Sequence, residues 1–202
     1  MKVEVDYKII LFILLFYFFG RIELYLIFVL SIILHELTHM LIAFFIKAEV
    51  TSITIGAMGM GIDVAFLGKQ NFSNKILFYM FGPLTNFILA YTFKDSIIEI
   101  SSINFALGVF NLLPILPLDG GKIVLELLKI IVGKDYASEI MICFTKLFLF
   151  ILSLLYAAIL VKVKNLYLIF LILYLWRLYF IEEEKWMLYK KARNCIKNIE
   201  IN

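Results

Sequence analysis

Two histidines and one glutamate within a single apolar stretch are the residues best suited to chemistry. His35 and His39 are the two histidines of the 202-residue chain, and Glu36 follows the first of them. On a helix, residues four apart lie on one face, one turn apart, so both imidazoles can bind one metal ion. Glu36 can then reach a water molecule at that ion and act as a general base. This HExxH pattern predicts a zinc site with a catalytic carboxylate.

The surroundings of this motif weigh against a chance match. The motif lies in an apolar run from about Leu24 to Ile46. A chance match would leave polar residues on a helix face buried in a bundle. Ionisable side chains within an apolar span are costly and rare, and they usually mark a functional site. The motif and its setting together favour a metal site inside a membrane.

A catalytic zinc ion needs a third protein ligand and an open coordination position. The chain has no third histidine, so the third ligand must be a carboxylate or a cysteine. Asp119 is the leading choice, because Pro114 and Pro117 break the preceding span and Gly120 allows close approach of the backbone. An aspartate in such a turn is also a common helix cap. The residues alone leave both roles of Asp119 open.

The composition is that of an integral membrane protein. Hydrophobic residues make up 63% of the chain, charged residues make up 17%, and the mean hydropathy is +0.98. Several runs approach the roughly 20 apolar residues that cross a bilayer. The net charge of +3 does not indicate nucleic-acid binding, because the basic residues cluster at the ends of the apolar runs. We therefore expect a lipid bilayer around the chain and no nucleic-acid partner.

The expected fold is an all-α polytopic membrane protein with about six transmembrane helices and a short β-hairpin or sheet after the second span. The β-branched, glycine-broken stretch 50–67 predicts the hairpin. The mixed charged and apolar stretch 122–139 predicts an amphipathic helix on the membrane surface. The spans are expected at about 9–19, 22–46, 76–93, 97–111, 140–161 and 166–181.

Positive charges predict the topology of these spans. An even number of crossings places both termini on one side of the membrane. Most lysines and arginines fall on that side, and the opposite side keeps Arg21, Lys94, Lys162 and Lys164. An excess of lysine and arginine is typical of cytoplasmic loops. We therefore expect both termini in the cytoplasm.

Three motifs resemble those of a known family, the site-2 proteases, which are intramembrane zinc metalloproteases. The stretch from His35 to His39 resembles their HExxH sequence. The stretch from Asn111 to Gly120 resembles their second motif, an Asn-x-x-Pro run that leads to Leu-Asp-Gly. The stretch from Gly82 to Asn86 matches a further family signature, Gly-Pro-x-x-Asn. The motifs occur in the order of the family and cover about residues 22–121.

This resemblance implies a role for each motif residue. His35, His39 and Asp119 would hold one Zn²⁺ per chain, and Glu36 would be the catalytic base. An intramembrane metalloprotease domain would cover residues 1–181, with its core in 22–121, and a cytoplasmic charged tail would cover 182–202. Six further motif residues are candidates for substrate binding or for support of the broken helices: Asn111, Asn86, Gly82, Pro83, Pro114 and Gly120.

Within the family, the compact six-span layout resembles the branch of the stage IV sporulation protease FB. That branch implies cleavage of the membrane-associated pro-sequence of a sporulation sigma factor in the mother cell, and inhibitory membrane proteins as partners. The chain departs from the family pattern at Thr38, where glycine is usual. A tail of about twenty residues leaves no nucleotide-sensing CBS domain, so the resemblance does not predict regulation by nucleotide here.

Two other functions are compatible with the sequence. A site-2 protease could act on an anti-sigma factor or on signal-peptide remnants. A metal-binding membrane scaffold or transporter could use the same histidines without cutting peptides. The centres of the third, fifth and sixth expected spans carry almost no ionisable residues, which disfavours a transport path.

Overall fold

The computed structural model describes residues 2–5, 14, 17–18, 20–56, 59–65, 70–163 and 167–201. These residues form two compact units, Met1–Leu112 and Leu113–Asn202, and each is described by itself. The first expected span, at about 9–19, lies mostly outside the described residues.

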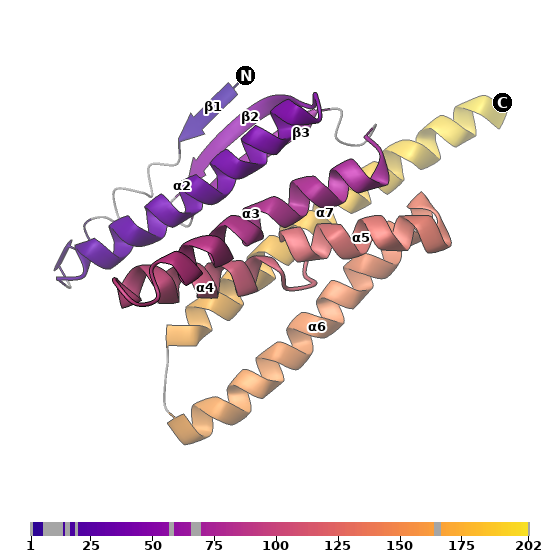
Figure 1. Ribbon diagram of the computed structural model, residues 1–202. Coiled ribbons are helices and arrows are strands. Elements are labelled where there is room, and N and C mark those ends of the chain that lie inside the picture. Colours follow the sequence, from indigo (N-terminus) through magenta and orange to yellow (C-terminus); the bar gives the residue numbers. More distant parts are fainter. Residues whose placement is uncertain are drawn as a thin grey trace. The chain divides into compact units, whose positions relative to one another are not determined.

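Three helices form the body of the first unit: α2 (Ile22–Phe45), α3 (Phe72–Thr92) and α4 (Ile98–Asn111). All three pack against one another, as Figure 1 shows. Small residues at such contacts let helices approach closely, and polar residues can bond across them. Each helix buries small or polar residues spaced four apart: Ser31, His35, His39 and Ala43 on α2, Gly82, Asn86 and Ala90 on α3, and Asn104 and Gly108 on α4.

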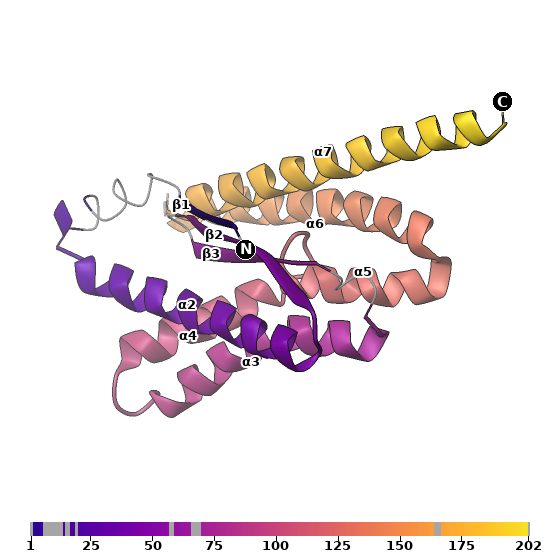
Figure 2. The same cartoon turned by 90° about the horizontal axis from the view of Figure 1, so that it is seen from above.

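Three strands accompany this helical layer. Strand β2 (Glu49–Gly56) pairs parallel with β1 (Lys2–Val5) and antiparallel with β3 (Gly59–Ala65), in the order β1-β2-β3. The pair β2–β3 lies where the alternating stretch 50–67 predicts a hairpin. Both of these strands contact α2, the helix that carries the histidines, and Figure 2 shows the strands beside it.

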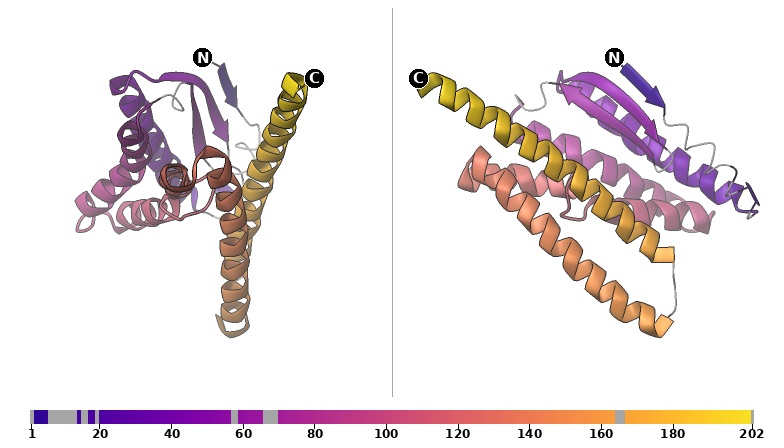
Figure 3. Two further views of the ribbon diagram at one scale, coloured as in Figure 1. Left: turned by 90° about the vertical axis from the view of Figure 1, so that its right-hand side faces the viewer. Right: turned by 180° about the vertical axis from the view of Figure 1, so that it is seen from behind.

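The second unit consists of α5 (Asp119–Val132), α6 (Lys134–Val163) and α7 (Tyr167–Ile201). Helix α6 packs against both α5 and α7, and Figure 3 shows α6 and α7 running side by side. A hydrogen bond from the Trp176 indole Nε1 to Ser153 Oγ, 3.0 Å long, joins α7 to α6.

The second unit corrects one expectation. The amphipathic helix expected at 122–139 is confirmed as far as Val132, but its expected end is wrong, because α5 ends there and α6 begins at Lys134. Gly133 between them has φ 83°, a left-handed conformation that glycine adopts readily and that ends a helix. Helix α7 runs from the expected last span through the expected tail to Ile201 without a break. The sequence contains no glycine or proline after Gly133 that would interrupt it.

Length and hydropathy mark two of the described helices as able to cross a bilayer, α2 and the Tyr136–Ala158 part of α6. Helix α4, expected as the fourth span, has 14 residues and is therefore about 21 Å long, shorter than a bilayer core of about 30 Å. Large apolar side chains such as Leu26 and Phe44 on α2 and Leu155 on α6 are more than half exposed. This exposure fits a membrane protein whose helices face lipid.

Gly121 is needed where the first turn of α5 meets the chain just before it. A Cβ at this position would lie 2.4 Å from the carbonyl carbon and oxygen of Ile115 and 2.7 Å from the backbone nitrogen of Leu116. Backbone atoms move less easily than the end of a side chain, so Gly121→Ala should overpack this turn. We expect a loss of about 1–3 kcal/mol of stability, measured as a lower midpoint of thermal unfolding in detergent. An unchanged midpoint would contradict this close approach.

Candidate metal centre

The two histidines of the motif lie on one face of α2, as their spacing predicts. Both are buried, with 4% of His35 and 3% of His39 exposed. Their ring centroids are 4.7 Å apart and the ring planes are nearly perpendicular. Glu36, between them in the sequence, is half-buried.

The hydrogen bonds of the Nδ1 atoms determine the tautomers of both rings. His35 Nδ1 lies 2.6 Å from Asn86 Oδ1, and His39 Nδ1 lies 2.7 Å from the backbone carbonyl oxygen of Phe78. Amide and carbonyl oxygens can only accept, so each Nδ1 must carry a proton and donate it. In a neutral imidazole the Nε2 atom is then a bare lone pair, the form that binds metal ions.

The two Nε2 lone pairs face each other at 3.0 Å. With both Nδ1 atoms donating, this contact is a hydrogen bond only if one ring carries a second proton, whereas two neutral rings set lone pair against lone pair. A cation between the rings would turn this repulsion into attraction, and Zn²⁺ binds imidazole nitrogen readily. The donor chemistry of the pair therefore fits a metal ion.

Gly82 on α3 leaves the space that such an ion needs. A Cβ added to Gly82 would lie 2.4 Å from His39 Nε2 and 2.6 Å from His35 Nε2, next to both lone pairs. Any side chain other than the hydrogen of glycine would fill the position from which one atom can contact both nitrogens. The space beside the two imidazoles therefore explains why the first position of the Gly-Pro-x-x-Asn signature is a glycine.

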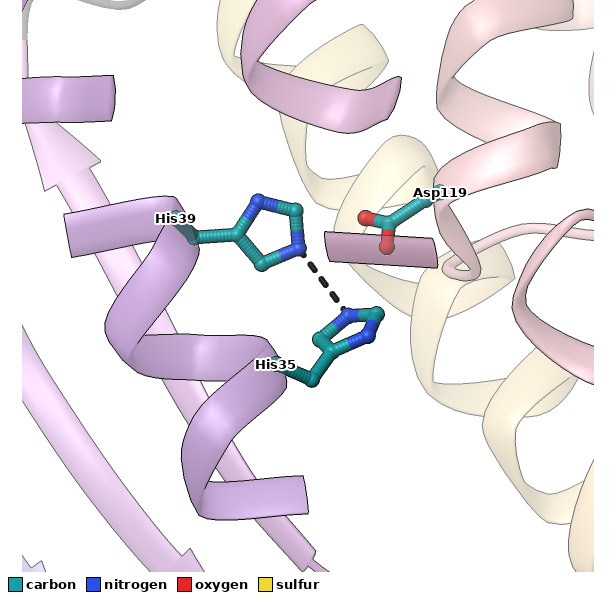
Figure 4. A group of neighbouring side chains, drawn as sticks. All are labelled: His35, His39 and Asp119. Atoms are coloured by element: carbon teal, nitrogen blue, oxygen red, sulfur yellow. Dashed lines mark hydrogen bonds between the residues drawn. The ribbon is translucent and has the colours of Figure 1, made fainter. Parts of the chain in front are cut away.

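Asp119 completes the group of potential ligands. It is buried and is the first residue of α5, where the helix dipole favours a negative charge. His35, His39 and Asp119 each offer one ligand atom, and these atoms lie within 4.8 Å of one another (Figure 4). Two imidazoles and one carboxylate are a donor set typical of catalytic zinc. These three residues are the candidate zinc site of the chain.

The structure places the other motif residues in different settings. Asn86 and Pro83 are buried inside the first unit. Gly120 is buried in the first turn of α5 and Pro114 is half-buried before it. Asn111 donates from Nδ2 to the Leu107 carbonyl of its own helix at 3.1 Å.

Thr38, which departs from the family pattern, bonds within α2 and touches α3. Its Oγ1 lies 2.9 Å from the Leu34 carbonyl oxygen and 2.9 Å from Thr85 Oγ1. The side chain that replaces glycine here therefore makes a polar contact between the two helices.

Three residues that contact the site or its supports lie outside the motifs: Phe78, Ser31 and Asn104. The role of Phe78 depends on its backbone carbonyl, which no side-chain pattern reveals. Ser31 and Asn104 left a signal, since both are polar residues in apolar helices and Ser31 precedes His35 by one helical turn.

Comparisons with known proteins agree with this site. A model of peptidase family M50 matches residues 95–155, which include Asp119. Rip3 of Mycobacterium tuberculosis is 32% identical over an alignment of 112 residues that covers 46% of this chain and 28% of Rip3. The zinc metalloprotease MJ0392 of Methanocaldococcus jannaschii is 31% identical over 119 residues, covering 52% of this chain and 33% of that protein. The chain thus spans about a third of the length of these relatives.

One solved structure shares the fold over nearly the whole chain. The site-2 protease from Methanocaldococcus jannaschii superposes with a TM-score of 0.67 at 24% sequence identity, covering 90% of this chain and 89% of that one. The chain therefore shares the fold of this site-2 protease, and its residues 95–155 match peptidase family M50.

Proposed function

We propose that this protein is an intramembrane zinc endopeptidase that cuts a membrane-associated protein. The observation that carries the proposal is the pair of buried imidazoles on α2, with their Nε2 lone pairs 3.0 Å apart and Asp119 within 4.8 Å of them. The pair lies on a helix that is apolar and long enough to cross a bilayer. A glutamate directly follows the first histidine, as the HExxH chemistry requires.

Each residue of the site has a distinct task in the proposed reaction. His35, His39 and Asp119 hold the ion, which when bound supplies a Lewis acid that polarises a peptide carbonyl and acidifies water. The Glu36 carboxylate accepts a proton from the attacking water and later delivers it to the nitrogen of the leaving amine. Gly82 keeps the position opposite both imidazoles open.

A peptide must be extended before its backbone can reach such a site. A helical substrate satisfies its own backbone hydrogen bonds and hides the scissile carbonyl, so it must unwind first. Among the described strands, β3 is at an edge of the sheet order β1-β2-β3. An edge strand presents backbone groups to which an extended segment can add. We propose that the unwound substrate pairs at this edge.

The substrate proposed first is the pro-sequence of a sporulation sigma factor, with inhibitory membrane proteins as further partners. This proposal rests on the resemblance of the compact layout to the sporulation branch, and it places both termini in the cytoplasm of the mother cell. An anti-sigma factor and signal-peptide remnants are the competing substrates.

The test is cleavage in a reconstituted membrane. The full chain is incorporated into lipid vesicles together with a tagged substrate of one of the three kinds, and products are followed by immunoblot. Cleavage of the sigma-factor precursor alone supports the first proposal. Cleavage of another substrate overturns the sporulation assignment, and zinc binding without cleavage of any of them overturns the protease function.

Replacing Asp119 with alanine should remove the third ligand of the ion. We expect the purified variant to contain much less than one zinc per chain and to lose cleavage, because two imidazoles alone bind zinc weakly. Metal content measured by mass spectrometry checks the result. The matched control is Asp95→Ala in the turn between α3 and α4, where the aspartate side chain is 88% exposed. Equal zinc content in both variants would remove Asp119 from the ligand set.

A further inference from the structure

A line of hydrogen bonds connects His35 to α2, α3 and α4. Asn86 on α3 accepts from His35 Nδ1 at its Oδ1 and donates from Nδ2 to Asn104 Oδ1 on α4, at 3.0 Å. Asn104 donates from Nδ2 to Ser31 Oγ on α2, at 2.9 Å. Ser31 lies one turn before His35, so the line returns to the helix on which it began. We call Asn104, Asn86 and His35 the relay, and Ser31 lies outside it as a further acceptor for Asn104.

The relay is sealed from solvent. Asn86 is 0% exposed and Asn104 is 1% exposed, and both belong to the largest fully buried side chains of the described residues. Leaving a buried amide without a hydrogen-bond partner costs roughly 1–3 kcal/mol. Because turning over one amide of the relay would break its bonds, each bond fixes the orientation of the side chains that it joins. Within the described part of the chain, no buried side-chain nitrogen or oxygen lacks a hydrogen-bond partner.

The bond from Asn104 to Ile100 determines which way both amides of the relay are oriented. Asn104 Nδ2 also donates to the backbone carbonyl of Ile100 at 2.9 Å. Because that carbonyl can only accept, Asn104 must turn its nitrogen toward Ile100 and its oxygen toward Asn86. Asn86 must then turn its own nitrogen toward Asn104 and its oxygen toward His35. His35 Nδ1 is thereby forced to be the donor.

We infer that Asn104 is a positioning residue that selects the metal-binding tautomer of His35 through Asn86. Without Asn104, nothing in the relay prevents the Asn86 amide from turning over. Its nitrogen would then face His35 Nδ1, the ring proton would move to Nε2, and the ligand lone pair would be lost. The two histidines differ in this respect, because a backbone carbonyl that cannot rotate holds the tautomer of His39. The inference assumes the metal site of the proposed function but does not depend on peptide cleavage.

The first test is zinc affinity of the full chain purified in detergent. Asn104→Leu keeps the approximate volume and removes the oxygen that orients Asn86. We expect its affinity for Zn²⁺ to fall about 10–100-fold, the size usual for lost support of a metal ligand. Should this variant fail to fold, Asn86→Leu breaks the relay next to His35 and carries the same expectation. Wild-type affinity in folded Asn104→Leu would overturn the inference.

Two controls separate positioning from simple helix packing. Ser31→Ala removes a hydrogen bond between α2 and α4, yet Ile100 still orients Asn104. Thr85→Val removes the polar contact between α3 and α2 at Thr38, outside the relay. Both should lower stability while keeping zinc affinity near that of the wild type. A loss of affinity that follows the loss of stability in all variants would show a merely structural role.

A double variant that restores zinc affinity gives a sharper test of the relay. Asn86→Asp places a carboxylate beside His35, and a carboxylate accepts from Nδ1 whichever way it turns. In the single variant this carboxylate faces Asn104 Oδ1, acceptor against acceptor. The double variant Asn86→Asp with Asn104→Leu removes that conflict, so it should bind zinc more tightly than either single variant. A double variant that is weaker than both would contradict the relay.

The tautomer itself can be observed, because the chain has two histidines. In metal-free protein with ¹⁵N-labelled histidine, the ring spectrum of the wild type should show protonated Nδ1 in both residues. In Asn104→Leu the His35 signals should move toward the other tautomer, and those of His39 should stay. Unchanged His35 signals would overturn the inference. A wild type that binds no zinc would overturn both this inference and the proposed function, whereas zinc binding without proteolysis would overturn only the latter.

Discussion

Glu36→Gln protein is expected to bind zinc like the wild type and to cut substrate about 10²–10⁴-fold more slowly, the range that general acid–base catalysis contributes. Glutamine keeps the size of the side chain but cannot accept the proton of the attacking water. Zinc binding should persist, because the proposed ligands are His35, His39 and Asp119. Cleavage in vesicles and metal content of the same preparation are the two measurements.

The position of Glu36 on the helix supports this expectation. At about 100° per residue, Glu36 lies about 100° around α2 from His35 and about 60° from His39. It therefore lies beside the ligand face without belonging to it, and it is half-buried where the histidines are buried. A carboxylate there can approach a water molecule at the ion without replacing a ligand.

A matched control is available on the same helix. Glu23 is exposed and lies in the first turn of α2, about three turns before the site. Glu23→Gln makes the same chemical change and should cut at the wild-type rate. If Glu36→Gln also cut at that rate, another group would have to be the base. If it lost zinc, Glu36 would act through the metal site and not through proton transfer.

Gly82→Ala is expected to abolish zinc binding while the chain still folds. The added methyl group would come within 2.6 Å of both Nε2 atoms, in the space that the ion requires. The atoms it meets are the ends of two side chains, so the rings can turn aside and the backbone of α3 can stay in place. Alanine also favours helix over glycine by about 0.5–1 kcal/mol, which offsets part of the cost of displacing the rings.

The measurement is the stabilisation that zinc confers on unfolding. A ligand present at 100 times its dissociation constant stabilises the folded state by about 2.7 kcal/mol, so added zinc should raise the unfolding midpoint of the wild type. The midpoint of Gly82→Ala should not respond to zinc. In the control Gly108→Ala on α4, the new Cβ meets the Phe87 ring at 2.9 Å, and its three nearest atoms all belong to that ring and not to a proposed ligand. That variant should unfold more easily and still respond to zinc, and a response in Gly82→Ala would contradict the assigned space.

Local spacing was enough to predict the central part of the site. The i, i+4 relation of His35 and His39 is a property of any helix, and the apolar run around them forms a helix at Ile22–Phe45. The hairpin after this helix was also predictable, because alternation and glycines act over a few residues. Residue spacing did not predict where α5 ends, because the backbone conformation of a glycine decides that position. Gly133 ends α5 within a stretch of mixed charged and apolar residues that continues on both sides.

The sequence by itself determined which residues can bind a metal ion and which helix carries two of them, because residue type and helical periodicity are local properties. Only the tertiary structure decided what surrounds those residues. Gly82 and Asn86 come from α3 and Asn104 from α4. The side-chain bonds that join His35, Asn86, Asn104 and Ser31 connect residues 18 to 73 positions apart along the chain. The shape of the ion's space and the proton positions on the imidazoles depend on helices meeting across the unit, and such contacts leave no periodic trace in one chain.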